Sequence, residues 1–482
     1  YLLLLLIIFM LFNKLEMHSS KVALVSENSE TLNFHDLILM TDKICQNIKK
    51  RSLIFLFSEN SVDSIVGYIS FIKSNCVVMI IDPKTKDSEF NLLFQRYSPD
   101  FLWCNKKTSL KTQKDFFSMI FELNNFHLLK NKKKISYEIN DNLMLLISTS
   151  GSLGDPKCVK LSYKNITQNS LAISKYLKIN FNDRAITTLP MNYSYGLSII
   201  NTHLNTGASI VLTSKTLVDK LFWKLFVNLK VNNFNGVPFT FEILKKIGLS
   251  KIFNKNVRYI TQAGGKMNNK YIEEITEKSL KTNIKFYVMY GQTEASPRMS
   301  YLDMNLWPNK LGSIGRPISG GNFWLENNNG EKIKKNNELG ELIYSGDNVF
   351  MGYSNNFKDL NREDVNQGKL NTGDIAKKDS EGFYFIAGRK KRIIKLYGER
   401  ISLDYVEEKL KERSYNVACE GKDDQLFIFY EKKDNTNIDI NEISKIINII
   451  PSRLNLKQID KLPKNESGKI LYSNLKKVIN NE

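Results

Sequence analysis

The stretch Ile147–Leu161 decides the fold, and it reads Ile-Ser-Thr-Ser-Gly-Ser-Leu-Gly-Asp-Pro-Lys-Cys-Val-Lys-Leu. It continues the apolar run Leu143–Ile147, which predicts a buried strand. Small hydroxyl residues and two glycines then replace the apolar side chains, so that a phosphate group can approach the backbone N–H groups closely. Lys157 adds a positive point charge that suits a polyphosphate. The stretch therefore predicts a strand followed by a phosphate-binding loop.

This loop differs from a Walker A motif, because Pro156 stands where the second glycine of Gly-x4-Gly-Lys-Ser/Thr would be. A flexible surface turn is the alternative interpretation, since Ser, Gly, Asp and Pro are also typical turn residues. The composition of the loop alone leaves both interpretations open.

Four further segments follow the loop in order. They are Tyr-Gly-Gln-Thr-Glu at 290–294, Asn-Thr-Gly-Asp at 371–374, Gly388–Gly398, and Pro-Lys-Asn-Glu-Ser-Gly-Lys at 463–469. Together with Ser148–Lys157 they resemble the signature motifs of the adenylate-forming (AMP-binding) superfamily, which includes acyl-CoA synthetases, adenylation domains and luciferases. The resemblance extends from about Leu15 to the C-terminus. It implies an enzyme that activates a carboxylic acid with ATP.

The composition is that of a globular protein with more than one domain. The chain has 482 residues, of which 42% are hydrophobic and 25% are charged. A net charge of +19 is compatible with nucleic acid or an anionic membrane as a partner, but the lysines are scattered among acids and asparagines. We therefore expect a generally cationic surface and no nucleic-acid partner.

Cysteine and histidine usage gives no sign of a disulfide framework or a metal centre. Cys45, Cys76, Cys104, Cys158 and Cys419 are odd in number and share no close spacing, and the histidines are dispersed. This predicts a reducing, cytoplasmic location. The apolar run Tyr1–Phe12 is too short to span a bilayer, so we expect an extension or the apolar part of a first helix. Membrane association through residues 1–12 is the alternative.

Strands and helices alternate in the first part of the chain. Ser52–Phe57 and Val77–Ile81 predict strands, with a helix at Ser61–Lys73 between them, which is typical of a parallel, helix-covered sheet. Past Leu311, short β-rich stretches between Gly and Asn turns predict a small β-barrel or sheet. The predicted fold class is α/β, with a large N-terminal domain of helix-covered sheets and a small β-barrel subdomain (residues 1–387), a hinge (388–392) and a small mobile α+β C-terminal domain (393–482).

The resemblance implies that the motif residues bind ATP and Mg²⁺. Glu294 follows a strand end, where a hard carboxylate suits Mg²⁺ bridging phosphate oxygens, and Thr293 is implied as a donor to the α-phosphate. A solvated acid after a turn is the alternative for Glu294. Tyr290 and Gly291 belong to the same nucleotide-binding motif. The residues implied to hold the β- and γ-phosphates are Ser148, Thr149, Ser150, Gly151, Ser152, Gly154 and Lys157.

The nucleoside part of ATP is assigned to two further segments. The resemblance implies that Ala263, Gly264 and Gly265 pack on the adenine, and an ordinary glycine turn is the alternative. Asp374 can accept two hydrogen bonds from the ribose hydroxyls, and Arg389 would add donors to ribose or phosphate. In isolation, Asn371–Asp374 is also typical of a hairpin turn.

The C-terminal motifs are implied to act through domain movement. In the family, a lysine at the position of Lys469 reaches the carboxylate and the α-phosphate, and Lys391 occupies the pivot between two domain orientations. Rotation would withdraw Lys469 and bring Lys395 and Gly398 towards a thiol tunnel. The chain departs from the family pattern at Cys158, which replaces a glycine, and in the basic run 390–392, which lacks an acidic pair.

The substrate is predicted to be an acid without an α-amino group. Pro190–Gly196 contains no acidic residue to pair with an ammonium group, and it resembles Pro-x-x-His-x-x-Gly of acyl-CoA ligases. The predicted enzyme is an ATP-dependent acid–thiol ligase that forms acyl-AMP and transfers the acyl group to CoA or to the phosphopantetheine of an acyl carrier protein. A stand-alone amino-acid adenylating enzyme and a non-enzymatic nucleotide-binding protein are the alternatives. The pocket candidates are Tyr193, Tyr195, Gly196, Val237 and Pro238.

Overall fold

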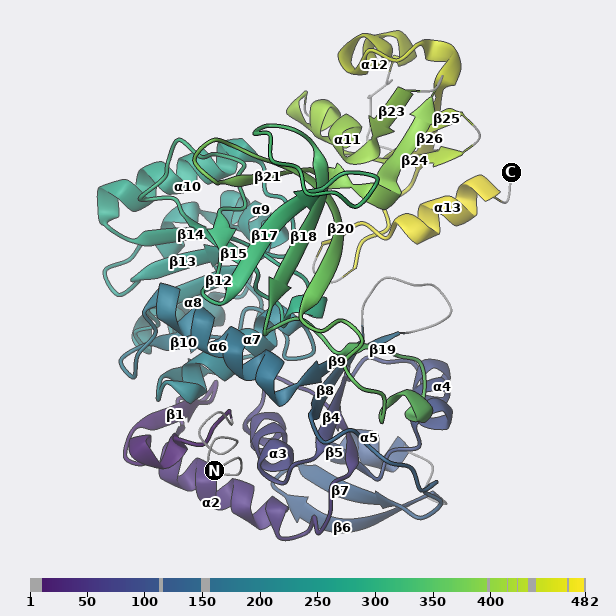
Figure 1. The fold of residues 1–482 in the computed structure, drawn as a ribbon. Coiled ribbons are helices and arrows are strands. Elements are labelled where there is room, and N and C mark those ends of the chain that lie inside the picture. Colours follow the sequence, from purple (N-terminus) through teal and green to yellow (C-terminus); the bar gives the residue numbers. More distant parts are fainter. Residues whose placement is uncertain are drawn as a thin grey trace. The chain divides into compact units, whose positions relative to one another are not determined.

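The computed structural model describes residues 11–111, 116–148, 157–396, 399–413, 415–422, 424–431, 439–465 and 468–480. The chain divides into two compact units, which we describe separately. Unit 1 comprises Tyr1–Leu311, Pro317–Asn322 and Ser345–Leu370, and unit 2 comprises Gly312–Arg316, Phe323–Tyr344 and Asn371–Glu482. Figure 1 labels the elements of both units.

The largest sheet of unit 1 has eight strands in the order β19-β9-β8-β4-β3-β5-β7-β6. Its centre is parallel, and antiparallel strands flank it on both sides. Every residue of β3 and β4 is buried, which explains their unbroken apolar sequences. The strands are β3 (Leu53–Phe57), β4 (Val77–Ile81), β5 (Phe101–Asn105), β6 (Phe117–Leu123), β7 (Phe126–Asn131), β8 (Leu143–Ser148), β9 (Cys158–Ser162) and β19 (Gly352–Ser354).

Two smaller sheets complete unit 1, and each has parallel strands at its centre. One has the order β10-β11-β1-β2. The other contains the parallel strands β12, β13 and β14, next to which β15 runs antiparallel. Their bounds are β1 (Val22–Val25), β2 (Thr31–Asn33), β10 (Arg184–Ile186), β11 (Ser209–Val211), β12 (Asn233–Gly236), β13 (Tyr259–Gln262), β14 (Lys285–Tyr290) and β15 (Ser300–Asp303).

Helices cover these sheets (Figure 1). α3 packs on β3, β4 and β5, and α6 packs on β8, β9 and α7. α6 begins with a capping box, because Ser162 and Asn165 exchange side chain–backbone hydrogen bonds. The helices are α2 (Phe34–Cys45), α3 (Val62–Lys73), α4 (Asp87–Tyr97), α5 (Lys106–Lys111), α6 (Tyr163–Leu177), α7 (Ser194–Asn205), α8 (Lys220–Asn228), α9 (Pro238–Ile247) and α10 (Asn269–Thr282).

Unit 2 combines a β-sheet with an α+β C-terminal part. The predicted small β-subdomain is a four-stranded sheet in the order β17-β18-β20-β21. A hairpin of β22 and β23 follows, and then a three-stranded sheet in the order β24-β25-β26. The elements are β17 (Gly321–Glu326), β18 (Gly340–Gly346), β20 (Lys369–Lys378), β21 (Tyr384–Arg389), β22 (Ile393–Leu396), β23 (Glu399–Ser402), α11 (Leu403–Glu412), β24 (Val417–Lys422), β25 (Gln425–Glu431), α12 (Ile440–Ile447), β26 (Leu454–Ile459) and α13 (Tyr472–Asn480).

The structure confirms the α/β class with a parallel, helix-covered core, and it corrects one local interpretation. The segment Asn371–Asp374 is no hairpin turn, because it lies inside β20, where Asp374 pairs with Arg389 of β21. At the start of the described chain, Leu11 and Phe12 are buried. No helix in the described ranges is long and apolar enough to cross a membrane. The predicted hinge at 388–392 and the domain bounds around it stay predictions.

Candidate active site

The predicted phosphate-binding loop lies between two paired strand ends. β8 ends at Ser148, which pairs with Cys158 at the start of β9, and the side chains of Ser148 and Lys157 are exposed. Thr149, Ser150, Gly151, Ser152 and Gly154 lie outside the described residues. The side chain of Cys158 is fully buried, and burial raises the pKa of its thiol to about 11. The cysteine that departs from the family pattern is therefore a neutral core residue.

Thr293 and Glu294 follow β14 in a 3₁₀ turn at Thr293–Ala295. The hydroxyl of Thr293 lies 3.1 Å from that of Ser194, the first residue of α7. Tyr353 donates a hydrogen bond of 2.8 Å to one carboxylate oxygen of Glu294. Burial, and then the charge of Glu294, raise the pKa of Tyr353, so its hydroxyl stays a donor. Glu294 is therefore held in place, and the interpretation as a freely solvated acid is not favoured.

The segment that follows Glu294 is fixed by two buried asparagines far away in the sequence. Asn348 donates through its side-chain amide to the carbonyl oxygens of Ala295 (2.7 Å) and Arg298 (2.8 Å). Asn169 in α6 donates to the same Arg298 oxygen at 2.7 Å. Gly291 lies close to this segment, since a Cβ atom there would overlap the carbonyl oxygen of Pro297. The backbone between β14 and β15 is thus held in one arrangement.

The predicted adenine segment, Ala263–Gly265, follows β13. Gly264 has a φ of +85°, and a Cβ atom there would overlap the hydroxyl of Tyr193. Val237 and Pro238, at the start of α9, lie beside Gly264 and Gly265. Gly264 and Gly265 are exposed, whereas Ala263 is buried. The structure therefore brings predicted adenine residues and predicted substrate residues together, with bare backbone facing outward.

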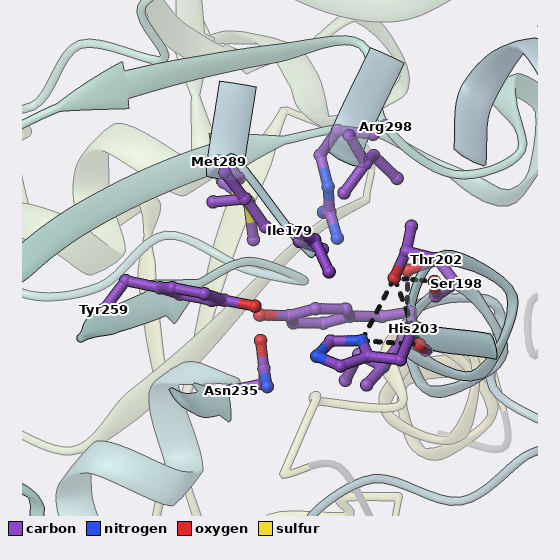
Figure 2. A pocket seen from close by; sticks show the side chains of 12 residues that line it. Ile179, Ser198, Thr202, His203, Asn235, Tyr259, Met289 and Arg298 are labelled. Atoms are coloured by element: carbon purple, nitrogen blue, oxygen red, sulfur yellow. Dashed lines mark hydrogen bonds between the residues drawn. The ribbon is translucent and has the colours of Figure 1, made fainter. Parts of the chain in front are cut away.

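A small cavity lies next to the first turns of α7 (Figure 2). Its volume is about 10 Å³, which is about the room of one water molecule. Among the predicted substrate residues, Tyr195 lines this cavity, and Gly196 instead packs against the carbonyl oxygen of Pro190. The lining contains no acidic residue. Its polar lining residues are Tyr195, Ser198, Thr202, His203, Asn235, Tyr259 and Arg298.

A chain of buried hydrogen bonds runs along one side of this cavity. It links the side chains of Tyr195 and Thr261 (2.6 Å), Thr261 and Asn235 (2.6 Å), Asn235 and Asn233 (2.8 Å), and Asn233 and His203 (3.2 Å). The other ring nitrogen of His203 lies 2.9 Å from the carbonyl oxygen of Ile199. Burial lowers the pKa of His203 to about 4, although nearby Asp183 opposes this shift. His203 is therefore neutral at pH 7.

Stability should depend on pH through His203. Its pKa in the folded state, about 4, lies below the value of about 6.5 for an unfolded chain. The unfolded state binds the proton more tightly, so we expect the free energy of unfolding to fall as the pH falls from about 6.5 to 4, by on the order of 3 kcal/mol. Urea unfolding of the wild type and of His203→Gln across this range checks the effect. Parallel pH profiles for the two proteins would contradict it.

In unit 2, the two residues predicted to contact ribose lie together. Asp374 in β20 and Arg389 in β21 are opposite each other, and their side chains form an ion pair of 3.3 Å. Asp374 is buried and Arg389 is half-exposed. The N–H of Arg389 also donates to Asp404, at 2.9 Å. A buried carboxylate beside an accessible guanidinium can present an acceptor and donors to a diol.

The predicted pivot, Lys391, is exposed in the 3₁₀ turn between β21 and β22. The next residue, Arg392, is buried, forms ion pairs with Asp404, Glu407 and Glu420, and stacks on Tyr472. Arg392 is thus attached firmly to the C-terminal part of unit 2. The side chain of Lys395, and Gly398, lie outside the described parts of the chain.

Lys469 is exposed on a loop whose two sides are bridged at Lys464 and Ile470. Its N–H donates to the side chain of Asn465 at 2.9 Å.

The profile of the family described as "AMP-binding enzyme" matches residues 11–354 of this chain.

The chain belongs to the AMP-binding enzyme family.

Curated relatives of this AMP-binding enzyme are CoA ligases. It is 26% identical to the 2-succinylbenzoate–CoA ligase of Bacillus cytotoxicus over 400 residues, which are 80% of this chain and 79% of that ligase. It is 28% identical to the oxalate–CoA ligase of Saccharomyces cerevisiae over 345 residues, 69% of this chain and 62% of that ligase.

Solved structures share the fold of this AMP-binding enzyme along almost its whole length. The o-succinylbenzoate CoA synthetase of Bacillus subtilis, in complex with an acyl-adenylate intermediate, has a TM-score of 0.76 at 19% identity, covering 97% of this chain and 98% of that one. ATP-bound MatB from Rhodopseudomonas palustris has a TM-score of 0.79 at 18% identity, again covering 97% and 98%. The predicted family, fold class and enzyme class, an AMP-forming ligase, are confirmed.

Several residues of this AMP-binding enzyme that shape the site carried no sequence signal. Asn169, Asn348 and Arg298 stand outside every motif, and Ser194 occupies an unspecified position of the Pro190–Gly196 element; their roles arise from contacts between distant parts of the chain. The roles of the individual motif residues remain predictions.

Proposed function

We propose that this AMP-binding enzyme is an ATP-dependent ligase that converts a carboxylic acid without an α-amino group into acyl-AMP and then into acyl-CoA. The observation that carries the proposal is the family match over residues 11–354. The arrangement of Thr293, Glu294 and Ser194 at the end of β14 and the start of α7 supports it.

In the first step, a carboxylate oxygen of the acid attacks the α-phosphorus of ATP, and the bond to pyrophosphate breaks. The Thr293 hydroxyl would donate to an α-phosphate oxygen, while the adjacent Ser194 hydroxyl orients it. Such preorganised donors stabilise the charge that develops in the transition state. Lys469 would add its positive charge at the same atoms, and Asp374 and Arg389 would hold the ribose.

The Glu294 side chain fits a Mg²⁺ ligand. One carboxylate oxygen accepts from Tyr353, and the other has no hydrogen-bond partner among the described residues. No group of three or more His, Cys, Asp or Glu side chains suited to a metal occurs in the described ranges. That agrees with Mg²⁺, which is commonly bound by one or two carboxylates plus phosphate oxygens and water. Bound Mg²⁺ would neutralise charge on the phosphates of ATP.

In the second step, the thiol sulfur attacks the acyl carbon, and AMP leaves with the electrons of the broken carbon–oxygen bond. Rotation about Lys391 would withdraw Lys469 and bring the region of Lys395 and Gly398 to the thiol. The names of the relatives, both CoA ligases, support CoA as the acceptor. An acyl carrier protein as acceptor and a cytoplasmic location remain predictions.

The cavity next to α7 supports an acid without an ammonium group. It contains a buried arginine and no acidic side chain, so that a cationic substrate group would be destabilised there. The acids in the names of the relatives, 2-succinylbenzoate and oxalate, likewise have no amino group.

Pyrophosphate exchange tests the proposal directly. The purified protein, ATP and Mg²⁺ are incubated with fatty, aryl, dicarboxylic and amino acids, and labelled pyrophosphate entering ATP is measured. We expect exchange with at least one acid that lacks an amino group, and a CoA thioester of that acid by mass spectrometry. Exchange with amino acids alone would favour the amino-acid adenylating alternative, and ATP binding without any exchange would favour a non-enzymatic protein.

A further inference from the structure

Backbone groups fix the direction of the buried hydrogen bonds that end at His203. The N–H of Arg184 donates to the side-chain oxygen of Asn232 at 2.9 Å, and the side-chain amide of Asn233 lies 3.2 Å from the same oxygen. Because that oxygen is an acceptor, the Asn233 group facing it is the NH₂ group. The same NH₂ group lies 3.2 Å from Nε2 of His203, so Nε2 is an acceptor and Nδ1 carries the proton. Nδ1 then donates to the carbonyl oxygen of Ile199 at 2.9 Å.

The roles of the remaining groups follow from this start. The Asn233 oxygen accepts from the NH₂ group of Asn235 (2.8 Å), and the Asn235 oxygen accepts from the hydroxyl of Thr261 (2.6 Å). A hydroxyl has one proton to donate, so Thr261 in turn accepts from the hydroxyl of Tyr195 (2.6 Å). All of these side chains are buried. The bonds from Tyr195 to His203 thus form a chain with a single donor direction, which we call the Tyr195–His203 chain.

The Tyr195–His203 chain joins three elements of unit 1. Tyr195 lies in the first turn of α7, Asn235 lies in β12, and Thr261 lies in β13. β12 and β13 are neighbours in the sheet, and Asn235 is directly opposite Thr261. The hydrogen bonds therefore connect the start of a helix to two strands close to the carboxyl ends of those strands.

The same three elements meet again at residues proposed to bind the nucleotide and the acid. A Cβ atom at Gly264, after β13, would lie 2.4 Å from the hydroxyl of Tyr193 and 3.1 Å from Cγ1 of Val237. Tyr193 precedes α7, and Val237 follows β12. Ser194, the first residue of α7, contacts Thr293. A shift of α7 against the two strands would alter all of these contacts, because protein interiors are close-packed.

We infer that the Tyr195–His203 chain positions the site: Thr261, Asn235 and His203 set where the start of α7 lies relative to the ends of β12 and β13. The inference rests on the proposed function and adds residues that act through Tyr195 and its neighbours. Misplacing a reacting group by about 1 Å can lower a rate about 100-fold. Loss of one hydrogen bond of the chain should therefore be visible in the kinetics of adenylation.

Thr261→Val and Thr261→Ser separate the hydroxyl from the shape of the side chain. Valine has nearly the same shape but cannot link Tyr195 to Asn235, whereas serine keeps the hydroxyl and loses only a methyl group. With the acid that the wild type exchanges best, we expect Thr261→Val to lower kcat/KM for ATP in pyrophosphate exchange about tenfold or more. Thr261→Ser should stay within a few-fold of the wild type.

Thr276→Val is the matched control for the loss of a buried threonine hydroxyl. Thr276 lies in α10 and is 4% exposed, and its hydroxyl donates to the carbonyl oxygen of Ile272 at 2.6 Å. This variant should lose stability in urea unfolding, as Thr261→Val does, but should keep the kcat/KM of the wild type. Each protein is assayed at a temperature at which urea unfolding shows it to be folded.

The donor direction has its own measurement. In protein labelled with ¹⁵N-histidine at neutral pH, the chemical shifts of His203 should be those of the Nδ1–H tautomer, with His203→Gln used to assign the signals. An Nε2–H tautomer would overturn the derived direction. If Thr261→Val does not fold, Tyr195→Phe removes the same hydrogen bond from its other end and takes its place in the comparison.

Three kinetic outcomes would overturn the positioning role and leave the proposed function intact. They are wild-type kcat/KM in Thr261→Val, equal losses in Thr261→Val and Thr261→Ser, and a loss in Thr276→Val as large as that in Thr261→Val. Absence of exchange by the wild type with every acid would refute the proposed function itself.

Discussion

Replacement of Lys469 by alanine is expected to lower the rate of acid adenylation at least about 100-fold, while thioester formation from supplied acyl-AMP changes little. The ammonium group would offset negative charge only while the carboxylate attacks the α-phosphorus. Lys469 is exposed on its loop, so the substitution should not disturb folding. Pyrophosphate exchange measures the first step, and CoA-thioester formation from synthetic acyl-AMP measures the second.

Lys464→Ala is the matched control for this experiment, because Lys464 is an exposed lysine on the same loop. It should leave both rates within a few-fold of the wild type. An equal loss of both steps in Lys469→Ala would contradict a role confined to adenylation, and with it the two-orientation mechanism.

Glu294→Gln should be the second severe change, with a loss of about 100- to 1,000-fold in pyrophosphate exchange. The amide keeps the size of the side chain and can still accept from Tyr353, but it lacks the charge that a magnesium ion requires. The variant should also need a higher Mg²⁺ concentration for half-maximal exchange. Titration of Mg²⁺ into protein treated with a chelator measures this directly.

Tyr353→Phe is the control for Glu294→Gln. It removes the hydrogen bond to Glu294 and retains the carboxylate, so we expect only a few-fold change in rate. A Glu294→Gln protein with normal Mg²⁺ dependence would show that the carboxylate has a structural role instead.

The sequence predicted those helices and strands whose local hydrophobic pattern matches their burial in the fold. β3 and β4 are central strands buried on both faces, so their apolar runs were informative. Thr293 and Glu294 were expected to follow a strand end, and they do follow β14 (Lys285–Tyr290). Thr293, Glu294, Arg389 and Lys469 thus fall at strand ends or in loops, where chemistry commonly occurs, whereas Asp374 lies inside β20.

Other features depended on distant partners. Asn371–Asp374 has the composition of a turn, but its place in β20, between β18 and β21 of a four-stranded sheet, overrides that local preference. The close approach of Gly196 to the carbonyl oxygen of Pro190 arises from the turn at Pro190–Tyr193 before α7, and a place for Gly196 in the substrate pocket stays a prediction. The buried hydrogen bonds from Tyr195 to His203 run through residues of separate elements, and the lack of a partner for Nε of Arg298 depends on its surroundings in space. No local sequence pattern predicts either feature.

The two asparagines that hold the backbone of Arg298 matter for protein engineering. Asn169 and Asn348 do not line the cavity next to α7. Both nevertheless donate a hydrogen bond to the carbonyl oxygen of Arg298, and Asn348 also donates one to that of Ala295. Variant libraries restricted to the residues that line the cavity would change side chains and leave the backbone of the Ala295–Arg298 segment where it is. Diversifying Asn169 and Asn348 would instead tilt the whole Ala295–Arg298 segment, and so give access to acids of other lengths.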